Sequence, residues 1–68
     1  MHISTKVSVS SKTDLKAFQD SLRDMKGVRK VLHLFGFTVM VYHDTNKISK
    51  ENLLEGIRVK GFIIMKAI

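Results

Sequence analysis

The side chains that could bind a metal in this 68-residue chain are histidines and methionines, because the sequence contains no cysteine. Imidazole nitrogens suit zinc and thioether sulfurs suit copper(I). The three histidines, His2, His33 and His43, show no ligand spacing such as His-x-x-x-His. The sharpest metal hypothesis that these residues offer is a zinc site formed by His33, His43 and Asp44. The residue types favour isolated imidazoles instead, so we expect no cofactor, with copper or zinc as the ions that such a site would take.

A catalytic site is not expected either. The sequence shows no nucleophile next to a base in a pattern typical of covalent catalysis. Acylphosphatase needs an arginine in a phosphate-binding loop after its first strand. The matching loop here reads Ser10-Ser11-Lys12-Thr13, with neither arginine nor glycine. The chain is therefore predicted not to be an enzyme.

The N-terminal half predicts a strand followed by a helix. Apolar and polar residues alternate from Ile3 to Val9, which is typical of a strand. Between Asp14 and Lys26 the apolar period lengthens to that of an amphipathic helix. The preceding Ser-x-x-Asp sequence, Ser11 to Asp14, is of the capping-box type, and Gly27 is placed to end the helix.

The second half predicts a hairpin, a helix and a last strand. Residues 28–35 and 37–42 are apolar strands on either side of Gly36. A second helix begins after Ser49 and ends before Gly61, and residues 62–68 form the final strand. This order predicts one α+β domain over residues 1–68, a ferredoxin-like βαββαβ sandwich. Its four-stranded antiparallel sheet carries both helices on one face.

The spacing of the apolar anchors resembles that of heavy-metal-associated domains, the fold of small copper chaperones and of N-terminal modules of metal-pumping ATPases. The resemblance covers nearly the whole chain and implies the same fold and a role in metal transport. The matching residues are Phe18, Leu22, Gly27, Val28, Val31, Val39, Val41, Asp44, Ser49, Leu53, Ile57, Gly61 and Phe62.

The metal motif of that family, Met-x-Cys-x-x-Cys, is replaced in this chain. Its cysteine positions fall on Ser11 and Asp14. A hydroxyl and one carboxylate cannot replace two thiolates around a soft metal ion. The resemblance then implies docking or regulation without the ion. In that family partners dock at the loop end, which here contains Lys12, Phe35, Phe37, Lys60 and Phe62.

The strands contain more apolar residues than one sheet face needs. In one register Val31, His33, Val39 and Val41 face the helices, and Leu32, Leu34, Met40 and Tyr42 form a contact surface on the other face. A register shifted by one residue would expose Val31, His33 and Phe35 instead. Either register predicts a protein partner or a homo-oligomer through the sheet face, a neighbouring edge strand or the loop end.

The charge balance favours acidic partners in general. Twelve Lys and Arg against six Asp and Glu give a formal net charge of +6. Phe35-Gly36-Phe37 is similar to the centre of the RNP1 motif of RNA-binding domains, but that motif belongs on the third strand. The sequence therefore favours a protein partner, with nucleic acid or another acidic partner as the alternative. Short apolar runs and a polar N-terminus predict a cytoplasmic chain outside the membrane.

Overall fold

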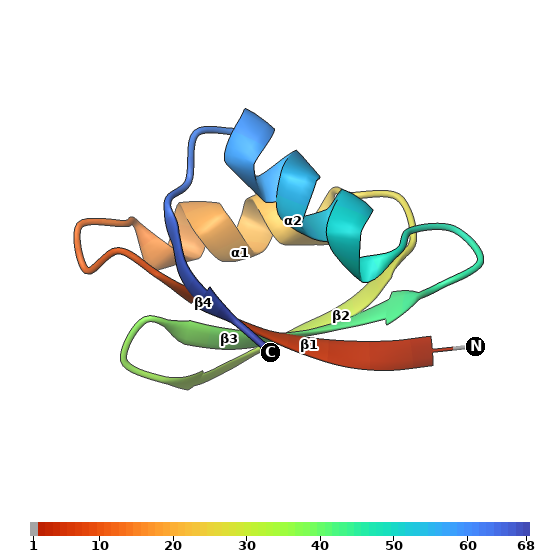
Figure 1. The fold of residues 1–68 in the computed structure, drawn as a ribbon. Coiled ribbons are helices and arrows are strands. Elements are labelled where there is room, and N and C mark those ends of the chain that lie inside the picture. Colours follow the sequence, from red (N-terminus) through yellow and green to blue (C-terminus); the bar gives the residue numbers. More distant parts are fainter. Residues whose placement is uncertain (1) are drawn as a thin grey trace.

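The computed structural model describes residues 2–68 and contains the predicted elements in the predicted order (Figure 1). The bounds of the strands and helices, in chain order, are β1 His2–Val9, α1 Leu15–Arg23, β2 Val28–Phe35, β3 Thr38–Asp44, α2 Lys50–Val59 and β4 Ile64–Ala67. The two helices are therefore short, and neither is long and apolar enough to cross a membrane in the part of the chain that the structure describes.

The four strands form one sheet in the order β2-β3-β1-β4, in which all neighbours are antiparallel. Both helices lie on the same face of this sheet (Figure 1). This arrangement confirms the predicted α+β, ferredoxin-like fold. The two edge strands are β2 and β4, and the central pair is β1 and β3.

Helix α1 begins at a different residue from the one that the sequence suggested. Its N-cap is Asp14, whose Oδ1 accepts hydrogen bonds from the backbone N–H groups of Lys16 (3.1 Å) and Ala17 (3.2 Å). A carboxylate at this position satisfies two amides that have no partner inside the helix. The prediction that Ser11 starts a capping box is therefore wrong, because Ser11 lies in the loop, three residues before the cap.

Two loops approach each other closely at Gly27, which follows the end of α1. The helix stops at Arg23 rather than at the predicted Lys26, and Gly27 takes a φ of +95°. Its carbonyl accepts a hydrogen bond from the Asp44 N–H, and a Cβ on Gly27 would lie 2.8 Å from Cγ2 of Ile48. Glycine is required here by both the backbone conformation and the lack of space.

The strand register gives the sheet a covered face and an open face. Val31, Val39 and Val41 pack beneath the helices, as the first of the two predicted registers has them. His33, which that register also placed toward the helices, is exposed, and an irregularity between His33 and Phe35 leaves Phe35 exposed opposite Thr38. The face turned away from the helices is called the open face below. Its residues, which follow from the cross-strand partners, are Ser4, Lys6, Ser8, Lys30, Leu32, Phe35, Thr38, Met40, Tyr42, Lys66 and Ile68. Leu34, which is exposed at the register shift between His33 and Phe35, is grouped with them.

The hydrophobic core lies between the covered face and the two helices. The ring of Phe18 meets that of Phe62 edge-to-face, with 5.0 Å between the centroids. Phe62 therefore lies before β4, which starts at Ile64, two residues later than predicted. The buried apolar residues are Val7, Val9, Phe18, Leu22, Val31, Val39, Val41, Leu53 and Ile57.

The connections gather at the two ends of the sheet as the topology requires. The β1–α1 loop, the β2–β3 hairpin and the α2–β4 connection meet at one end (Figure 1). Backbone hydrogen bonds join them there, from Val9 N–H to the Phe37 carbonyl and from Ser10 N–H to the Ile63 carbonyl. This end is called the loop end below.

Candidate functional site

The β1–α1 loop, where the resemblance places a metal motif, does not fit a soft metal ion. Asp14 uses its Oδ1 to cap α1, and Ser11 is an exposed hydroxyl that has no accessible anionic form. Oxygen donors of this kind suit hard cations, whereas copper(I) selects sulfur. A hollow of about 310 Å³ lies beside this loop, between Thr13 and Phe62, and offers no sulfur donor among its lining residues.

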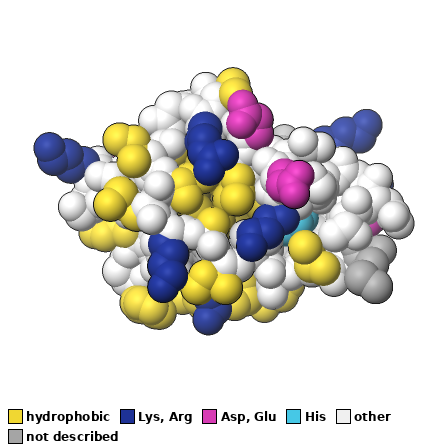
Figure 2. Space-filling model, in the orientation of Figure 1, with side chains coloured by type: hydrophobic (Ala, Val, Ile, Leu, Met, Phe, Trp, Pro, Cys, Tyr) yellow, Lys and Arg dark blue, Asp and Glu magenta, His cyan; other side chains and the backbone are white. Residues whose placement is uncertain are grey.

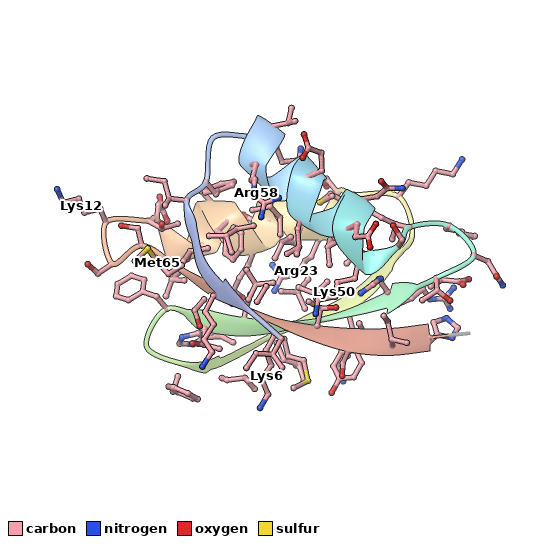
Figure 3. The ribbon with its side chains drawn as sticks, viewed as in Figure 1. Lys6, Lys12, Arg23, Lys50, Arg58 and Met65 are labelled. Carbon is pink, nitrogen blue, oxygen red and sulfur yellow. The ribbon has the colours of Figure 1, made fainter. Side chains whose placement is uncertain are left out.

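The aromatic residues predicted for the loop end are not brought together into one cluster. Phe62 turns inward onto Phe18, and Phe37 packs partly buried against the core. Phe35 leaves this group and stands on the open face, with 70% of its surface exposed. Lys12 and Lys60 are both exposed at the loop end, and Figure 3 shows Lys12 pointing outward from its loop.

His43 is fully buried and uses both ring nitrogens within the protein. Its Nδ1 lies 3.0 Å from the backbone carbonyl oxygen of Ile48, and its Nε2 lies 2.8 Å from Oγ1 of Thr5. A carbonyl only accepts, so Nδ1 carries the proton and Nε2 accepts from the Thr5 hydroxyl. Each polar atom of this pair is thus satisfied, which makes His43 a structural residue of the covered face.

His33 and Asp44, the other residues of the predicted zinc site, lie apart from one another. His33 is the cross-strand partner of Val39, four residues or about 13 Å along β3 from His43. Its Nε2 lies 2.8 Å from the Gly36 carbonyl oxygen. Within residues 2–68 no three side chains of the His, Asp and Glu types gather closely enough to hold a metal ion.

Asp44 closes the turn that follows β3. The N–H of Asn46 donates a hydrogen bond to Oδ1 of Asp44 over 2.9 Å. This bond lowers the pKa of Asp44 below its ordinary 3.8, and the positive charges of His2 and Lys47 act in the same direction. The carboxylate is therefore held in its charged form by its own turn.

The open face is ordered as rows that cross the sheet. Cross-strand partners run from Phe35 through Thr38 and Ser8 to Lys66, so one row spans all four strands. The next row lies about 6.6 Å further along the strands and contains Leu32, Met40, Lys6 and Ile68. The step between the rows is two residues, except on β2, where the irregularity makes it three. The third row contains Lys30, Tyr42 and Ser4.

The charged residues of these three rows are all lysines, one in each row. Lys6 points from the sheet to the side away from the helices (Figure 3). In the described part of the chain no carboxylate lies within ion-pair distance of Lys6, Lys30 or Lys66. Asp44 follows on the same side of β3, but beyond the third row and engaged with its turn. The open face thus presents positive charge that no carboxylate of the described residues neutralises.

A hollow of about 170 Å³ lies at the loop-end corner of the open face. Its wall is the row of Phe35, Thr38, Ser8 and Lys66, together with Lys6 and Ile68 of the next row. The hydroxyls of Ser8 and Thr38 share one hydrogen bond of 2.7 Å, so one hydroxyl proton remains for another acceptor. Two ammonium groups, a hydroxyl donor and an exposed phenyl ring therefore surround one small space.

Of the contact residues predicted for the sheet face, Leu32, Met40 and Tyr42 lie in the rows of the open face. Leu32 and Leu34 are 36% and 37% exposed, and Met40 and Tyr42 are half-buried beside them. Sequence reasoning missed Lys6, Ser8, Lys66 and Ile68. The alternation of Ser4, Lys6 and Ser8 in β1 could have identified the first two, because every second residue of a strand faces the same side.

Exposed apolar side chains also occur near β4. Val59, Ile63 and Met65 are each more than half exposed. Figure 2 shows hydrophobic side chains in the opening between α2 and β4, where Figure 3 labels Arg58 and Lys50. Along the sheet side of the same view, hydrophobic side chains lie next to lysine or arginine side chains. The open-face hollow differs from the hollow that Ile63 lines in having two lysines, no carboxylate and a phenyl ring that is 70% exposed.

No known family model matches the chain, and none of the curated proteins matches its sequence. The likeness to heavy-metal-associated domains therefore depends on the spacing of the anchor residues alone.

Proposed function

We propose that this protein is a non-catalytic binding module that holds an acidic partner on the open face of its sheet. The observation that supports this proposal is the composition of that face. It combines a central apolar surface around Leu32, Leu34 and Met40 with lysines that no carboxylate of residues 2–68 pairs with. Interfaces commonly join an apolar centre to a polar rim, and complementary charge then selects the partner.

The charge pattern argues against a second copy of the chain as the occupant of this face. Two copies packed face to face would bring Lys6, Lys30 and Lys66 near the same lysines of the other copy. Like charges placed together at an interface cost several kcal/mol. The same lysines would attract a partner that carries carboxylates or phosphates, so a different, acidic molecule fits better.

The resemblance to heavy-metal-associated domains adds a context for such docking. A relative of these domains that lacks thiolates, as Ser11 and Asp14 imply, would act in metal transport by docking or regulation rather than by carrying the ion. Under this proposal the open face, and not the former metal loop, makes the main contact. The loop end with Lys12 and Lys60 would then contribute secondary charge.

Titration of the ¹⁵N-labelled protein with two anionic probes tests this proposal. The probes are a decamer of glutamate and a decamer of deoxythymidylate, added at low salt while backbone amide shifts are recorded. We expect shifts at Lys6, Met40 and Lys66 with at least one probe, because binding changes the surroundings of these amides. Amides of the exposed α2 residues Glu51 and Glu55 serve as the reference for unbound surface.

A titration in which neither probe shifts the open-face amides would contradict the proposed function. Shifts spread evenly over all lysines would contradict it as well, since that pattern indicates attraction by net charge without a site. Millimolar solutions of the free protein provide a further comparison. Concentration-dependent shifts confined to the open face would indicate a second copy as the occupant instead.

A further inference from the structure

We infer that the acidic partner of the open face is a single-stranded nucleic acid, with a phosphate between Lys6 and Lys66 and a base on the ring of Phe35. This inference rests on the proposed function and names the partner of the same site. It starts from the corner hollow, where these three side chains surround about 170 Å³.

The anion site is formed by two lysines that repel each other when the hollow is empty. Lys66 is the cross-strand partner of Ser8, and Lys6 precedes Ser8 by two residues, so both lysines occupy the same face of adjacent strands. Like charges on neighbouring strands are unfavourable unless an opposite charge lies between them. A phosphate would provide that charge, and the Ser8–Thr38 hydroxyl pair can donate to a further phosphate oxygen.

The ring of Phe35 supplies a stacking surface beside this anion site. It is 70% exposed although it lines the hollow, so a planar group can lie on it without displacing a core residue. Stacking of bases on aromatic side chains is the main sequence-tolerant contact in proteins that bind single strands. A phosphate and a base from adjoining nucleotides would use both parts of the corner together.

A second pair of an ammonium group and an aromatic ring favours a polymer over a single nucleotide. Lys30 and Tyr42 are direct cross-strand partners in the third row of the open face. Tyr42 lies four residues along β3 from Thr38, about 13 Å from the Phe35 row, with Lys6 between them. A strand that carries one phosphate and one base per repeat could contact both ends of this track.

The same geometry favours nucleic acid over an acidic protein segment, and a single strand over a duplex. Carboxylate side chains would satisfy the lysines, but they bring no planar group to the two aromatic rings. Bases within a duplex are stacked on each other and cannot reach a ring on a sheet, whereas those of a single strand can. The open face also contains no helix that could enter a groove.

Fluorescence anisotropy with 5′-labelled deoxythymidylate decamer tests the stacking contact. The variant Phe35→Ala removes the ring from an exposed position, and we expect binding to weaken about fivefold or more, as loss of one stacked base implies. Val59→Ala is the matched control, because Val59 is 75% exposed on α2 and far from the track in the fold. We expect that variant to bind like the parent protein.

The phosphate contacts are tested by the dependence of binding on salt. For single strands the slope of log K against log salt falls by about 0.7 for each phosphate contact removed. The double variant with Lys6→Gln and Lys66→Gln should therefore lower the slope by about 1.4. The charge-matched control is Lys16→Gln with Lys50→Gln, which removes two exposed lysines of the helices, outside the open face and the loop end, and should leave the slope nearly unchanged.

The outcomes separate this inference from the proposed function. Decamer binding that weakens in Phe35→Ala and depends less steeply on salt in the open-face double variant supports both. Open-face binding of the glutamate decamer without binding of the nucleic acid overturns the inference and leaves the proposed function intact. Nucleic acid binding that is equally sensitive to both double variants, or that ignores the loss of Phe35, also overturns the inference. Absence of open-face binding with either probe contradicts both.

Discussion

The covered and open faces of the sheet are made by alternate residues of the same strands, but their polar groups are paired differently. On the covered face the polar residues find partners inside the protein: His43 bonds to Thr5 and to the Ile48 carbonyl. On the open face Lys6 and Lys66 have no carboxylate partner among the described residues. The polar groups of the covered face are therefore satisfied within the protein, whereas the lysines of the open face lack a counter-charge among the described residues.

Two hydroxyl contacts show this difference most directly. Thr5 and Thr38 both lie on the central strands, and each shares a short hydrogen bond across the sheet, with His43 and Ser8 respectively. The first bond is buried, so its loss leaves a polar atom without water. The second is only partly buried and can be replaced by solvent. The same chemistry is thus structural on one face and available for binding on the other.

The largest expected difference between the faces concerns two phenylalanines. Phe18 is fully buried in the core, and Phe35 is 70% exposed. Phe18→Ala should destabilise the fold by about 3–5 kcal/mol through lost burial and the cavity left behind. A domain of this size has only about 3–5 kcal/mol of stability, so we expect this variant to be largely unfolded by circular dichroism at 25 °C.

Phe35→Ala is the counterpart, and its free energy of unfolding in urea should lie within about 0.5 kcal/mol of the parent. Phe18→Leu keeps most of the apolar volume and extends the comparison to a variant that folds, at a cost of about 1–2 kcal/mol. Equal destabilisation by Phe18→Leu and Phe35→Ala would contradict the assignment of Phe18 to the core and of Phe35 to an exposed surface.

The next largest effect is expected at the buried hydroxyl. Thr5→Val keeps the shape of the side chain but leaves Nε2 of His43 without its donor, which should cost about 1–3 kcal/mol. Thr38→Val makes the same change on the open face and should cost about 0.5 kcal/mol or less, because the Ser8 hydroxyl stays near solvent. Urea unfolding of the two variants measures the difference, and a larger loss for Thr38→Val would reverse the assignment of the two threonines.

Most of the architecture could be predicted because it depends on local periodicity. Alternation in residues 3–9 and the helical spacing of Leu15, Phe18 and Leu22 indicate which side of each element is buried. The order of the elements then limits the sheet to few topologies. The ends of elements were less certain. Asp14 rather than Ser11 caps α1. Both residue types are common N-caps, so the sequence alone does not show at which of them the loop ends and the helix begins.

The candidate site was harder to predict because it is assembled across strands. Phe35 and Lys66 are 31 positions apart and meet only through the pairing of all four strands. The sequence pattern of one strand shows which residues share a face, but not which residues of the neighbouring strands lie beside them. The apolar members Leu32, Leu34, Met40 and Tyr42 were found by alternation, whereas the lysines looked like ordinary surface charge.

A smaller effect is expected when the apolar centre of the open face is made polar. Leu34 is 37% exposed and lies on edge strand β2, so Leu34→Gln should cost about 1 kcal/mol or less in urea unfolding. Its buried counterpart, Val31→Thr, is on the same strand but faces the core, and should cost more because a hydroxyl enters an apolar space. A greater loss for Leu34→Gln would indicate that the open face is part of the core.

The smallest expected effect concerns Asp44, where the open face ends and the turn begins. The Asn46 N–H lowers the pKa of this carboxyl in the folded protein below its ordinary 3.8. A group of this kind stabilises the fold above pH 3.8, and that contribution is lost as the pH falls through the lowered pKa. Urea unfolding between pH 5 and about pH 2 should show this loss.

Asp44→Asn keeps an oxygen acceptor for Asn46 but cannot titrate, so the stability of this variant should depend less on pH over this range. Identical pH profiles of the parent and the variant would show that the stability of the turn does not depend on the charge of Asp44. Backbone contacts, such as the hydrogen bond from the Asp44 N–H to the Gly27 carbonyl, would then hold the turn at this end of the open face.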